Sequence, residues 1–336
     1  MMPRGEAYCV AVPKRWANES IKILSASSLL STHYKIASNE DKVYIPVINV
    51  DEALKTLLSK GIDAEPCFVE FERKEQRMKR LTTVIKSYSI LGDIAIFSYT
   101  HKIPVEEYKR AAIELVTNNK KIRSVYLKKE TSGEYRTPIL IHLAGEKKTV
   151  TRVKEYGLVF ELDVEKVYYN QRLSGERRRV AEQVKPDEKI LDMFAGIGVF
   201  PLHIASLTPA LIVANDINPY AANYMIKNIE LNKKQLLGTI IPMKADAMIL
   251  DKILREGFDR IIMNNPTMVT QFLPIACKLA RRNAIIHYYR LAKTCEDVET
   301  ELRQLGACSI QIIGCRKVID HGPSTHVFSL DLEIEK

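Results

Sequence analysis

Two acidic residues frame a pair of glycines between two short apolar runs. The first run leads into Asp192, and Gly196 and Gly198 follow it. A helical stretch and a second apolar run come next and end at Asp216. This order predicts a strand, a tight turn, a helix and a second strand, which is the first half of a nucleotide-binding α/β domain. Glycine allows both the turn and a close approach of the backbone to a ligand.

The chemistry of this turn suits S-adenosylmethionine better than a dinucleotide. Its pattern is G-x-G-x-x-P, so Pro201 stands where a dinucleotide fold has a third glycine. Proline has no N–H, which makes the start of the helix less suited to a pyrophosphate. Asp192 would repel phosphate and favours a cationic ligand, while Asp216 can accept hydrogen bonds from both ribose hydroxyls. The residues therefore indicate S-adenosylmethionine rather than NAD, and the alternative is an α/β domain that binds nothing here.

Later strand ends carry further polar groups. Asp246 and Ala247 follow the third expected strand, and Asn264 and Pro266 follow the fourth. Ligands bind where the carboxyl ends of parallel strands meet. We expect the backbone of 195–198 to contact the methionine part of the cofactor. We expect Asp246 and the Ala247 amide to face the adenine, and Asn264 to lie near the sulfonium and the incoming base. A single aspartate at a strand end is weak support, because such residues often only cap the next helix.

The alternation of strands and helices continues to the end of the chain. The last two expected strands, 309–318 and 327–333, are joined by a loop without a helix. Seven strands with a final hairpin are the organisation of class I methyltransferases, whereas a dinucleotide fold would end in a parallel strand reached through a helix. We therefore predict an α/β, class I (Rossmann-like) catalytic domain over 173–336.

Two smaller α/β (α+β) modules are expected before this domain, over 1–66 and 67–172. The first has no catalytic constellation, so we expect it to dock a partner. The second begins near a charge run at 70–81, which is either a solvated surface or an RNA contact. Basic residues recur between its expected antiparallel strands, as they would in an RNA-facing sheet or in any exposed sheet.

The composition is that of a water-soluble protein with a polyanionic partner. The 336 residues carry a net charge of +9, which suits RNA but also fits a generally lysine-rich proteome. No apolar run reaches about 18 residues and no signal peptide is recognisable, so we expect a cytoplasmic protein without a membrane span. The six cysteines form no C-x-x-C pair, which argues against a zinc site or a disulfide scaffold and fits a reducing cytosol.

Four segments together carry a family resemblance. They are 168–177 (YYNQRLSGER), 192–200 (DMFAGIGVF), 215–233 (NDINPYAANYMIKNIELNK) and 263–266 (MNNP). In combination they resemble the archaeal and eukaryotic-type tRNA (guanine-37-N1)-methyltransferases over essentially the whole chain. The resemblance implies a first domain that docks on the tRNA elbow, a basic second domain and a catalytic third domain. It also implies a monomer that needs no protein partner and methylates N1 of the purine just 3′ of the anticodon.

The resemblance assigns roles to individual residues. Guanine N1 carries a proton, so a base must remove it while charge on O6 is stabilised. Glu176 matches the base, Arg136 the donor to O6, Tyr168 the residue that positions base and cofactor, and Asn264 the first residue of N-x-P. Arg177 matches the arginine beside the cofactor carboxylate. A carboxylate is a weak base in water, so burial would have to raise the pKa of Glu176.

The resemblance completes the set of expected cofactor contacts. For Glu176 taken alone, the alternative is a surface acid on a helix that pairs with Arg179 or Arg172. The residues expected to bind S-adenosylmethionine are Arg177, Asp192, Phe194, Ala195, Gly196, Gly198, Asp216, Ile217, Asp246, Ala247, Asn264 and Pro266.

Departures from the family pattern surround the expected substrate pocket. Val199 stands where proline is common, Asn265 precedes Pro266 in place of an apolar residue, and 169–171 replaces a segment with phenylalanine and proline. They suggest a divergent subfamily, in which C-methylation of the tricyclic wyosine precursor is a second activity to test. Two alternatives stay open: a wyosine-pathway 3-amino-3-carboxypropyl transferase, and a non-catalytic RNA-binding protein.

Overall fold

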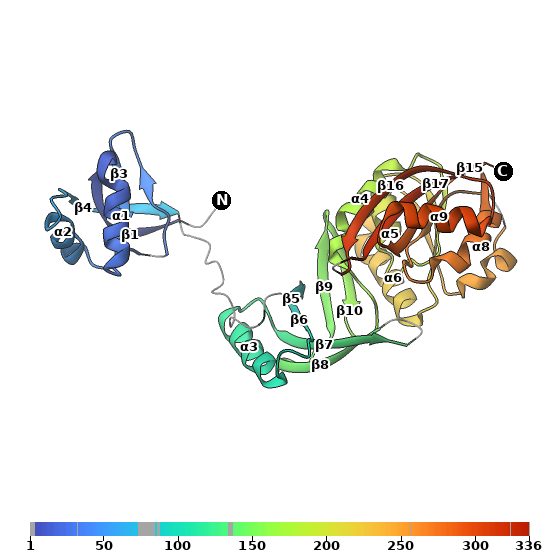
Figure 1. Ribbon diagram of the computed structural model, residues 1–336, viewed down its shortest axis with the longest axis horizontal. Coiled ribbons are helices and arrows are strands. Elements are labelled where there is room, and N and C mark those ends of the chain that lie inside the picture. Colours follow the sequence, from blue (N-terminus) through green and yellow to red (C-terminus); the bar gives the residue numbers. More distant parts are fainter. Residues whose placement is uncertain are drawn as a thin grey trace. The chain divides into compact units, whose positions relative to one another are not determined.

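The computed structural model describes residues 4–31, 33–72, 85, 88–133, 137–255, 257–322 and 324–335. The chain forms two compact units, Met1–Arg80 and Leu81–Lys336, which are described separately (Figure 1). Arg136, the expected donor to O6, lies outside the described residues. Among those that are described, no helix is both long and apolar enough to cross a membrane.

The N-terminal unit is a four-stranded antiparallel sheet with two helices. The strand order is β2-β3-β1-β4. Side chains from the sheet and from both helices share one core, which includes Val10, Leu24, Ile45 and Leu57. The elements are β1 (Arg4–Pro13), α1 (Ala17–Ala26), β2 (Ala37–Ser38), β3 (Lys42–Pro46), α2 (Val50–Leu58) and β4 (Glu65–Glu72).

The expected boundary at residue 66 falls inside β4. This strand pairs with β1 from Ala11↔Glu65 to Arg4↔Glu72, so the unit extends to at least residue 72. The outward face of the edge strand β4 carries Pro66, Phe68, Glu70 and Glu72, so the second half of the strand continues into the charge run in the sequence. Residues 73–81 of the charge run lie outside the described residues.

The C-terminal unit begins with a second small sheet. Its order is β5-β6-β7-β8, with β6 and β7 parallel and α3 between them in the chain. The apolar run over 89–97 predicts one strand, but the structure forms two, because Gly92 turns the chain at a φ of +56°. A side chain at Gly92 would collide with Thr151 and Arg152. The elements are β5 (Tyr88–Leu91), β6 (Ile94–Ser98), α3 (Val105–Asn118), β7 (Ser124–Ser132) and β8 (Thr137–Gly145).

A hairpin of β9 (Val150–Glu155) and β10 (Leu158–Asp163) connects this small sheet to the rest of the unit (Figure 1). On one side, the Thr151 hydroxyl lies 3.2 Å from the Leu91 carbonyl oxygen. On the other side, α6 (Pro219–Asn232) supplies side-chain amides that bond the backbone of β10. One hydrophobic cluster runs through all three parts. The two modules expected to meet at residue 172 therefore form one packed body.

The catalytic sheet has the expected topology. Its order is β13-β12-β11-β14-β15-β17-β16, and β17 is antiparallel to both of its neighbours. The remaining five strands, β11 to β15, run parallel. This confirms the class I methyltransferase fold with its closing hairpin. The elements are α4 (Ser174–Gln183), β11 (Lys189–Asp192), α5 (Val199–Ala205), β12 (Leu211–Asn215), α6, β13 (Thr239–Met243), α7 (Leu250–Ile253), β14 (Phe258–Met263), α8 (Leu273–Leu279), β15 (Ala280–Ala292), α9 (Cys295–Leu305), β16 (Ile310–Asp320) and β17 (His326–Ile334).

All six cysteines form disulfides, so the expectation that they do not was wrong. Strand pairing places the first two cysteines directly opposite each other on β1 and β4. The other two bonds tie α8 and α9 to the segment 308–315. The partners are 20 to 58 residues apart in the chain, so spacing alone did not reveal them. The pairs are Cys9–Cys67, Cys277–Cys308 and Cys295–Cys315.

Breaking the Cys295–Cys315 bond should lower the free energy of unfolding by about 3 kcal/mol. The bond closes a loop of 20 residues, and its loss restores the conformational entropy of that loop in the unfolded chain. Denaturant unfolding of the Cys295→Ser/Cys315→Ser double variant, compared with the parent under oxidising conditions, measures the change. Equal stability of the two proteins would contradict a bond that constrains the fold.

Candidate active site

The glycine turn after β11 has the geometry that only glycine adopts readily. Gly196 has a φ of +57° and Gly198 a φ of +87°. A Cβ on Gly198 would lie 2.7 Å from the Cγ of Met225 in α6, which is closer than real contacts allow. A Cβ on Gly196 would point towards the carbonyl oxygen of Tyr168, 4.0 Å away. The segment that begins at Tyr168 therefore borders the turn.

Asp216 connects the end of β12 to this turn. Its Oδ2 accepts a hydrogen bond from the Gly196 amide at 2.7 Å, and its Oδ1 accepts one from the Asn218 amide at 2.9 Å. Burial raises the pKa of Asp216, and the two amides oppose that rise. Each carboxylate oxygen keeps a further lone pair for a ribose hydroxyl. The side chain is thus held in place and still able to accept from a ligand.

Asp192 is fully buried beside the turn with one oxygen unpaired. Its Oδ1 accepts from the Phe194 amide at 3.2 Å, while Oδ2 has no partner among the described residues. Burial raises the pKa of Asp192 to about 8, and the charge of Asp216 adds to the effect. An unpaired buried carboxylate oxygen is stabilised by a cationic donor. The methionine ammonium of S-adenosylmethionine would supply one, so the residues present fit this cofactor.

The next strand ends are tied together by Asn215, which the sequence analysis overlooked. Its Nδ2 donates to the Met193 carbonyl at 3.2 Å, and its Oδ1 accepts from the Ala245 amide at 2.9 Å. The ends of β11, β12 and β13 are thereby fixed to one another. An asparagine directly before Asp216, the expected ribose acid, was the signal in the sequence.

The other expected cofactor residues surround this cluster. Asp246 uses Oδ1 to cap the 3-10 turn Ala247–Ile249, accepting from the Met248 amide at 2.9 Å, and its side chain is otherwise exposed. Ala195 and Ala247 are buried. Three further residues are partly buried at the same edge of the sheet: Phe194, Ile217 and Pro266. The cap uses only Oδ1, so it leaves Oδ2 of Asp246 for the expected contact with adenine.

Glu176 is brought to the same edge by α4 and β15. Its Oε1 accepts from the Tyr289 hydroxyl at 2.8 Å, and only 8% of the residue is exposed. Met263 and Tyr288 are paired in register on β14 and β15, so Tyr289 is level with Asn264. Asn264 is partly buried, and its side chain forms no hydrogen bond within the described part of the chain. The expected base and the expected N-x-P amide therefore lie along one strand edge.

The pKa of Glu176 is shifted in the direction opposite to the one expected. Burial by itself favours a raised pKa, but hydrogen bonds from Arg179 and Tyr289 outweigh it and hold the pKa below its usual value. Arg179 binds both oxygens, with Nε at 2.8 Å from Oε2 and Nη2 at 2.7 Å from Oε1. The alternative pairing with Arg179 is thus present, but at a buried position and not on a solvated surface.

Arg177 is held by a second buried carboxylate, Glu155 of β9, which the sequence analysis also missed. Its Nη1 lies 2.6 Å from Glu155 Oε1, and its Nη2 donates to the Asn170 carbonyl at 2.9 Å. Glu155 also accepts from the Tyr169 hydroxyl and lies 2.9 Å from His203 Nε2. Burial raises the pKa of Asp192, and the charge of Arg177 opposes this rise, so Arg177 acts on the carboxyl group beside the glycine turn.

Comparison with known proteins places the chain in a family. Residues 151–313 match the TRM5/TYW2 methyltransferase domain, 9–55 the tRNA methyltransferase 5 N-terminal domain, and 73–149 the TYW2 N-terminal domain. The Trm5b tRNA (guanine(37)-N(1))-methyltransferase of Methanocaldococcus jannaschii is 33% identical over 98% of this chain and 99% of its own. The chain belongs to the TRM5/TYW2 methyltransferase family. Membership confirms the fold and S-adenosylmethionine as the cofactor.

Two further TRM5/TYW2 relatives are informative. The solved complex of aTrm5 with tRNALeu has a TM-score of 0.71 and 27% identity, covering 97% of this chain and 99% of that one. Taw22 of Nanoarchaeum equitans is named a tRNA (guanine(37)-N(1))/4-demethylwyosine(37)-methyltransferase. It is 34% identical over 56% of this chain and 59% of its own.

Proposed function

We propose that this TRM5/TYW2 family member transfers a methyl group from S-adenosylmethionine to N1 of guanosine 37 in tRNA. The proposal depends mainly on the position of Glu176. Its carboxylate accepts a hydrogen bond from Tyr289, which is level with Asn264, and the same domain contains the glycine turn expected to bind the cofactor. The named activity of the full-length relative supports it. One chain supplies every assigned residue, so we propose that it acts as a monomer.

The reaction needs a base, a donor to O6 and a platform for the purine. Glu176 takes the N1 proton, so the electron pair left on N1 can attack the methyl group that S-adenosylmethionine supplies. Arg136 is proposed to donate to O6 as charge builds there. Tyr168 is proposed to stack on the purine; its 55% exposed surface and the position of its backbone near the glycine turn support this role. Asn264 orients the incoming base with its free amide.

Nucleoside mass spectrometry of an unmodified tRNA transcript tests this function. A gain of one methyl group at guanosine 37 is the expected result. A gain of an aminocarboxypropyl group would assign the chain to the other reaction, and absence of any cofactor binding by calorimetry would revive a purely RNA-binding role. A second substrate is tRNA carrying the tricyclic precursor. It tests whether the chain also C-methylates this precursor, an activity that the name of the Taw22 relative suggests.

The anticodon loop has a candidate groove in the C-terminal unit. A cavity of about 850 Å³ lies between β5, β9 and residues 169–172. Arg152, Lys154 and Arg172 line it and are all exposed. Cationic side chains beside the segment that starts at Tyr168 suit the phosphates on either side of a nucleotide held there. We propose that this groove positions the loop around position 37.

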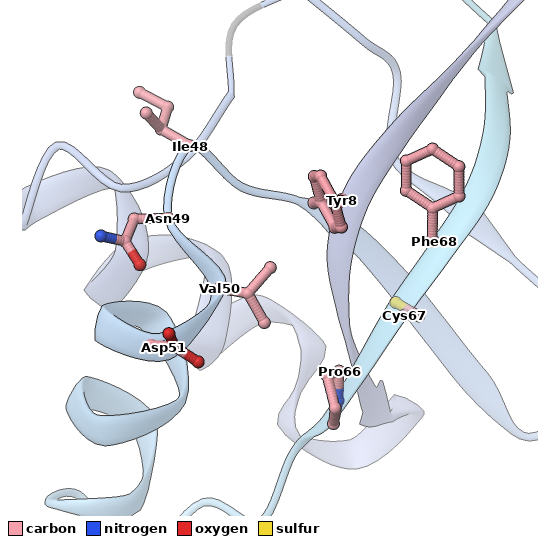
Figure 2. Close-up of a pocket in the computed structure, with 8 residues that line it drawn as sticks. All are labelled: Tyr8, Ile48, Asn49, Val50, Asp51, Pro66, Cys67 and Phe68. Atoms are coloured by element: carbon pink, nitrogen blue, oxygen red, sulfur yellow. The ribbon is translucent and has the colours of Figure 1, made fainter.

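The elbow contact is proposed for the N-terminal unit, at an aromatic pair shown in Figure 2. Tyr8 and Phe68 face each other across β1 and β4, with ring centroids 4.8 Å apart. Tyr8 is 64% exposed and Phe68 is 53% exposed. They line a cavity of about 670 Å³. Glu6 and Glu70 flank the pair on the same face, which disfavours phosphate. The surface therefore suits stacking on exposed bases.

Replacing Tyr8 and Phe68 together by Ala should weaken binding of full-length tRNA about 10-fold or more. The estimate follows from ~1–3 kcal/mol for each base stacked on an aromatic ring. Binding of an isolated anticodon stem-loop should not change, because it has no elbow. Leu58→Ala, at an exposed apolar residue of α2 outside the cavity, is the control. Equal loss on both RNAs would rule out the elbow contact.

A further inference from the structure

Arg179 lies one helical turn after Glu176 and serves two carboxylates. Besides its two bonds to Glu176, its Nη1 lies 3.0 Å from Asp331 Oδ2 and its Nη2 lies 3.2 Å from Asp331 Oδ1. Its side chain is 23% exposed, and both carboxylate side chains are less than 10% exposed. The guanidinium group is therefore shared between the expected base and a second acid on β17.

Besides Arg179, two further side chains donate to Asp331. Arg316 of β16 lies 3.0 Å from its Oδ2, and His287 Nδ1 lies 2.7 Å from its Oδ1. The Nε2 of His287 lies 2.8 Å from Nη1 of Arg260, which can only donate. His287 must therefore accept at Nε2 and donate its single proton to Asp331. Burial lowers the pKa of His287, in agreement with a neutral ring.

We propose that Arg179 and Asp331 are positioning residues for the base: Arg179 holds the Glu176 carboxylate, and Asp331 limits how strongly it does so. This inference rests on the proposed function, because it treats Glu176 as the group that accepts the N1 proton. The groups that face Glu176 from the packed elements are Arg179 on α4, Tyr289 on β15 and Ser329 on β17, with His287, Asp331 and Arg316 behind Arg179.

The arrangement balances charge during the proton transfer. When Glu176 accepts the N1 proton it becomes neutral and loses most of its attraction for Arg179. Without another partner, Arg179 would then be a poorly compensated, partly buried cation. Asp331 stays ionised, because its four contacts with His287, Arg179 and Arg316 keep its pKa low despite burial. It neutralises Arg179 at that moment and also prevents Glu176 from being too weak a base.

Single-turnover methylation rates between pH 4 and pH 8 test this inference on the full chain. Arg179→Gln should raise the midpoint of the acid limb by about 1 to 2 pH units, because an opposite charge at this range lowers a carboxyl pKa by about that much. Adding Asp331→Asn should move the midpoint back down, because it removes a negative charge near Glu176. Arg178→Gln, which removes an exposed pair with Glu182 on the same helix, is the control and should leave the midpoint unchanged.

A purely structural role predicts a different pattern. In that case Arg179→Gln would slow the reaction equally at every pH, and adding Asp331→Asn would slow it further without moving the midpoint. Either result overturns the inference. If Arg179→Gln does not fold, as judged by lost cofactor binding, Tyr289→Phe is the second test. It removes one donor to Glu176 and should also raise the midpoint; an unchanged midpoint would count against the inference.

The Glu176→Gln variant distinguishes a failure of the base assignment from a failure of the positioning role alone. If it retains its turnover, Glu176 is not the base and the proposed mechanism fails. If it loses turnover while the midpoints of the Arg179 and Asp331 variants do not move, only the positioning role fails.

Discussion

Replacing Glu176 by Gln is expected to lower the rate of methyl transfer by about 100- to 10,000-fold, the usual contribution of a general base. Glutamine keeps the shape of the side chain and can still accept from Tyr289 and Arg179. It cannot take up the N1 proton, so guanine stays a poor nucleophile. The affinity for S-adenosylmethionine should not change, because none of the assigned cofactor contacts involves Glu176. Single-turnover kinetics and calorimetry measure the two quantities.

Glu182→Gln is the matched control for this substitution. Glu182 lies on the same helix, α4, but is exposed and pairs only with Arg178 within the described structure. It should retain the parent rate. An unchanged single-turnover rate in Glu176→Gln would refute the base assignment, and so would an equal loss in both variants.

Replacing Asp216 by Ala should weaken S-adenosylmethionine binding by about 100-fold or more. Hydrogen bonds to a charged group contribute ~1.5–3 kcal/mol each, and the carboxylate is proposed to accept from two ribose hydroxyls. The substitution also removes the bond that holds the Gly196 amide at 2.7 Å, so the turn loses its tether to β12. Calorimetric titration with the cofactor measures the loss.

The effect of Asp216→Ala should appear in affinity more than in turnover at saturating cofactor. Asp251→Ala removes an acid that pairs with Lys278 away from the turn, and it should bind the cofactor like the parent. If Asp216→Ala lowered turnover and left the affinity unchanged, the ribose role would be wrong.

Local patterns in the sequence were sufficient for the catalytic fold. The sequence predicts helices over 105–118 and 295–305, and α3 (Val105–Asn118) and α9 (Cys295–Leu305) have these bounds. The glycine turn, the acid at the end of β12 and the closing hairpin were also found from the sequence. These features depend on periodicity, turn chemistry and apolar runs, which are properties of neighbouring residues.

Features that depend on distant residues were missed or misjudged. The edge strand β4 ends in glutamates that continue into the charge run, so its second half looked like part of a linker. Cysteines up to 58 residues apart are bonded. Glu155, on the hairpin, holds Arg177 from 22 residues away. None of these contacts leaves a local pattern, because each forms only when separate elements pack together.

The basicity of Glu176 shows most clearly what the sequence determined and what the tertiary structure decided. The sequence placed Glu176 at the start of a helix, and the family resemblance implied that it is the base. The direction of its pKa shift was decided mainly by Arg179, which is shared with Asp331 152 residues further on, and also by Tyr289, 113 residues from Glu176. Electrostatic energy depends on distance in space and on the exclusion of water. The sequence by itself therefore determined which groups are present, and only the tertiary structure decided how strongly each holds a proton.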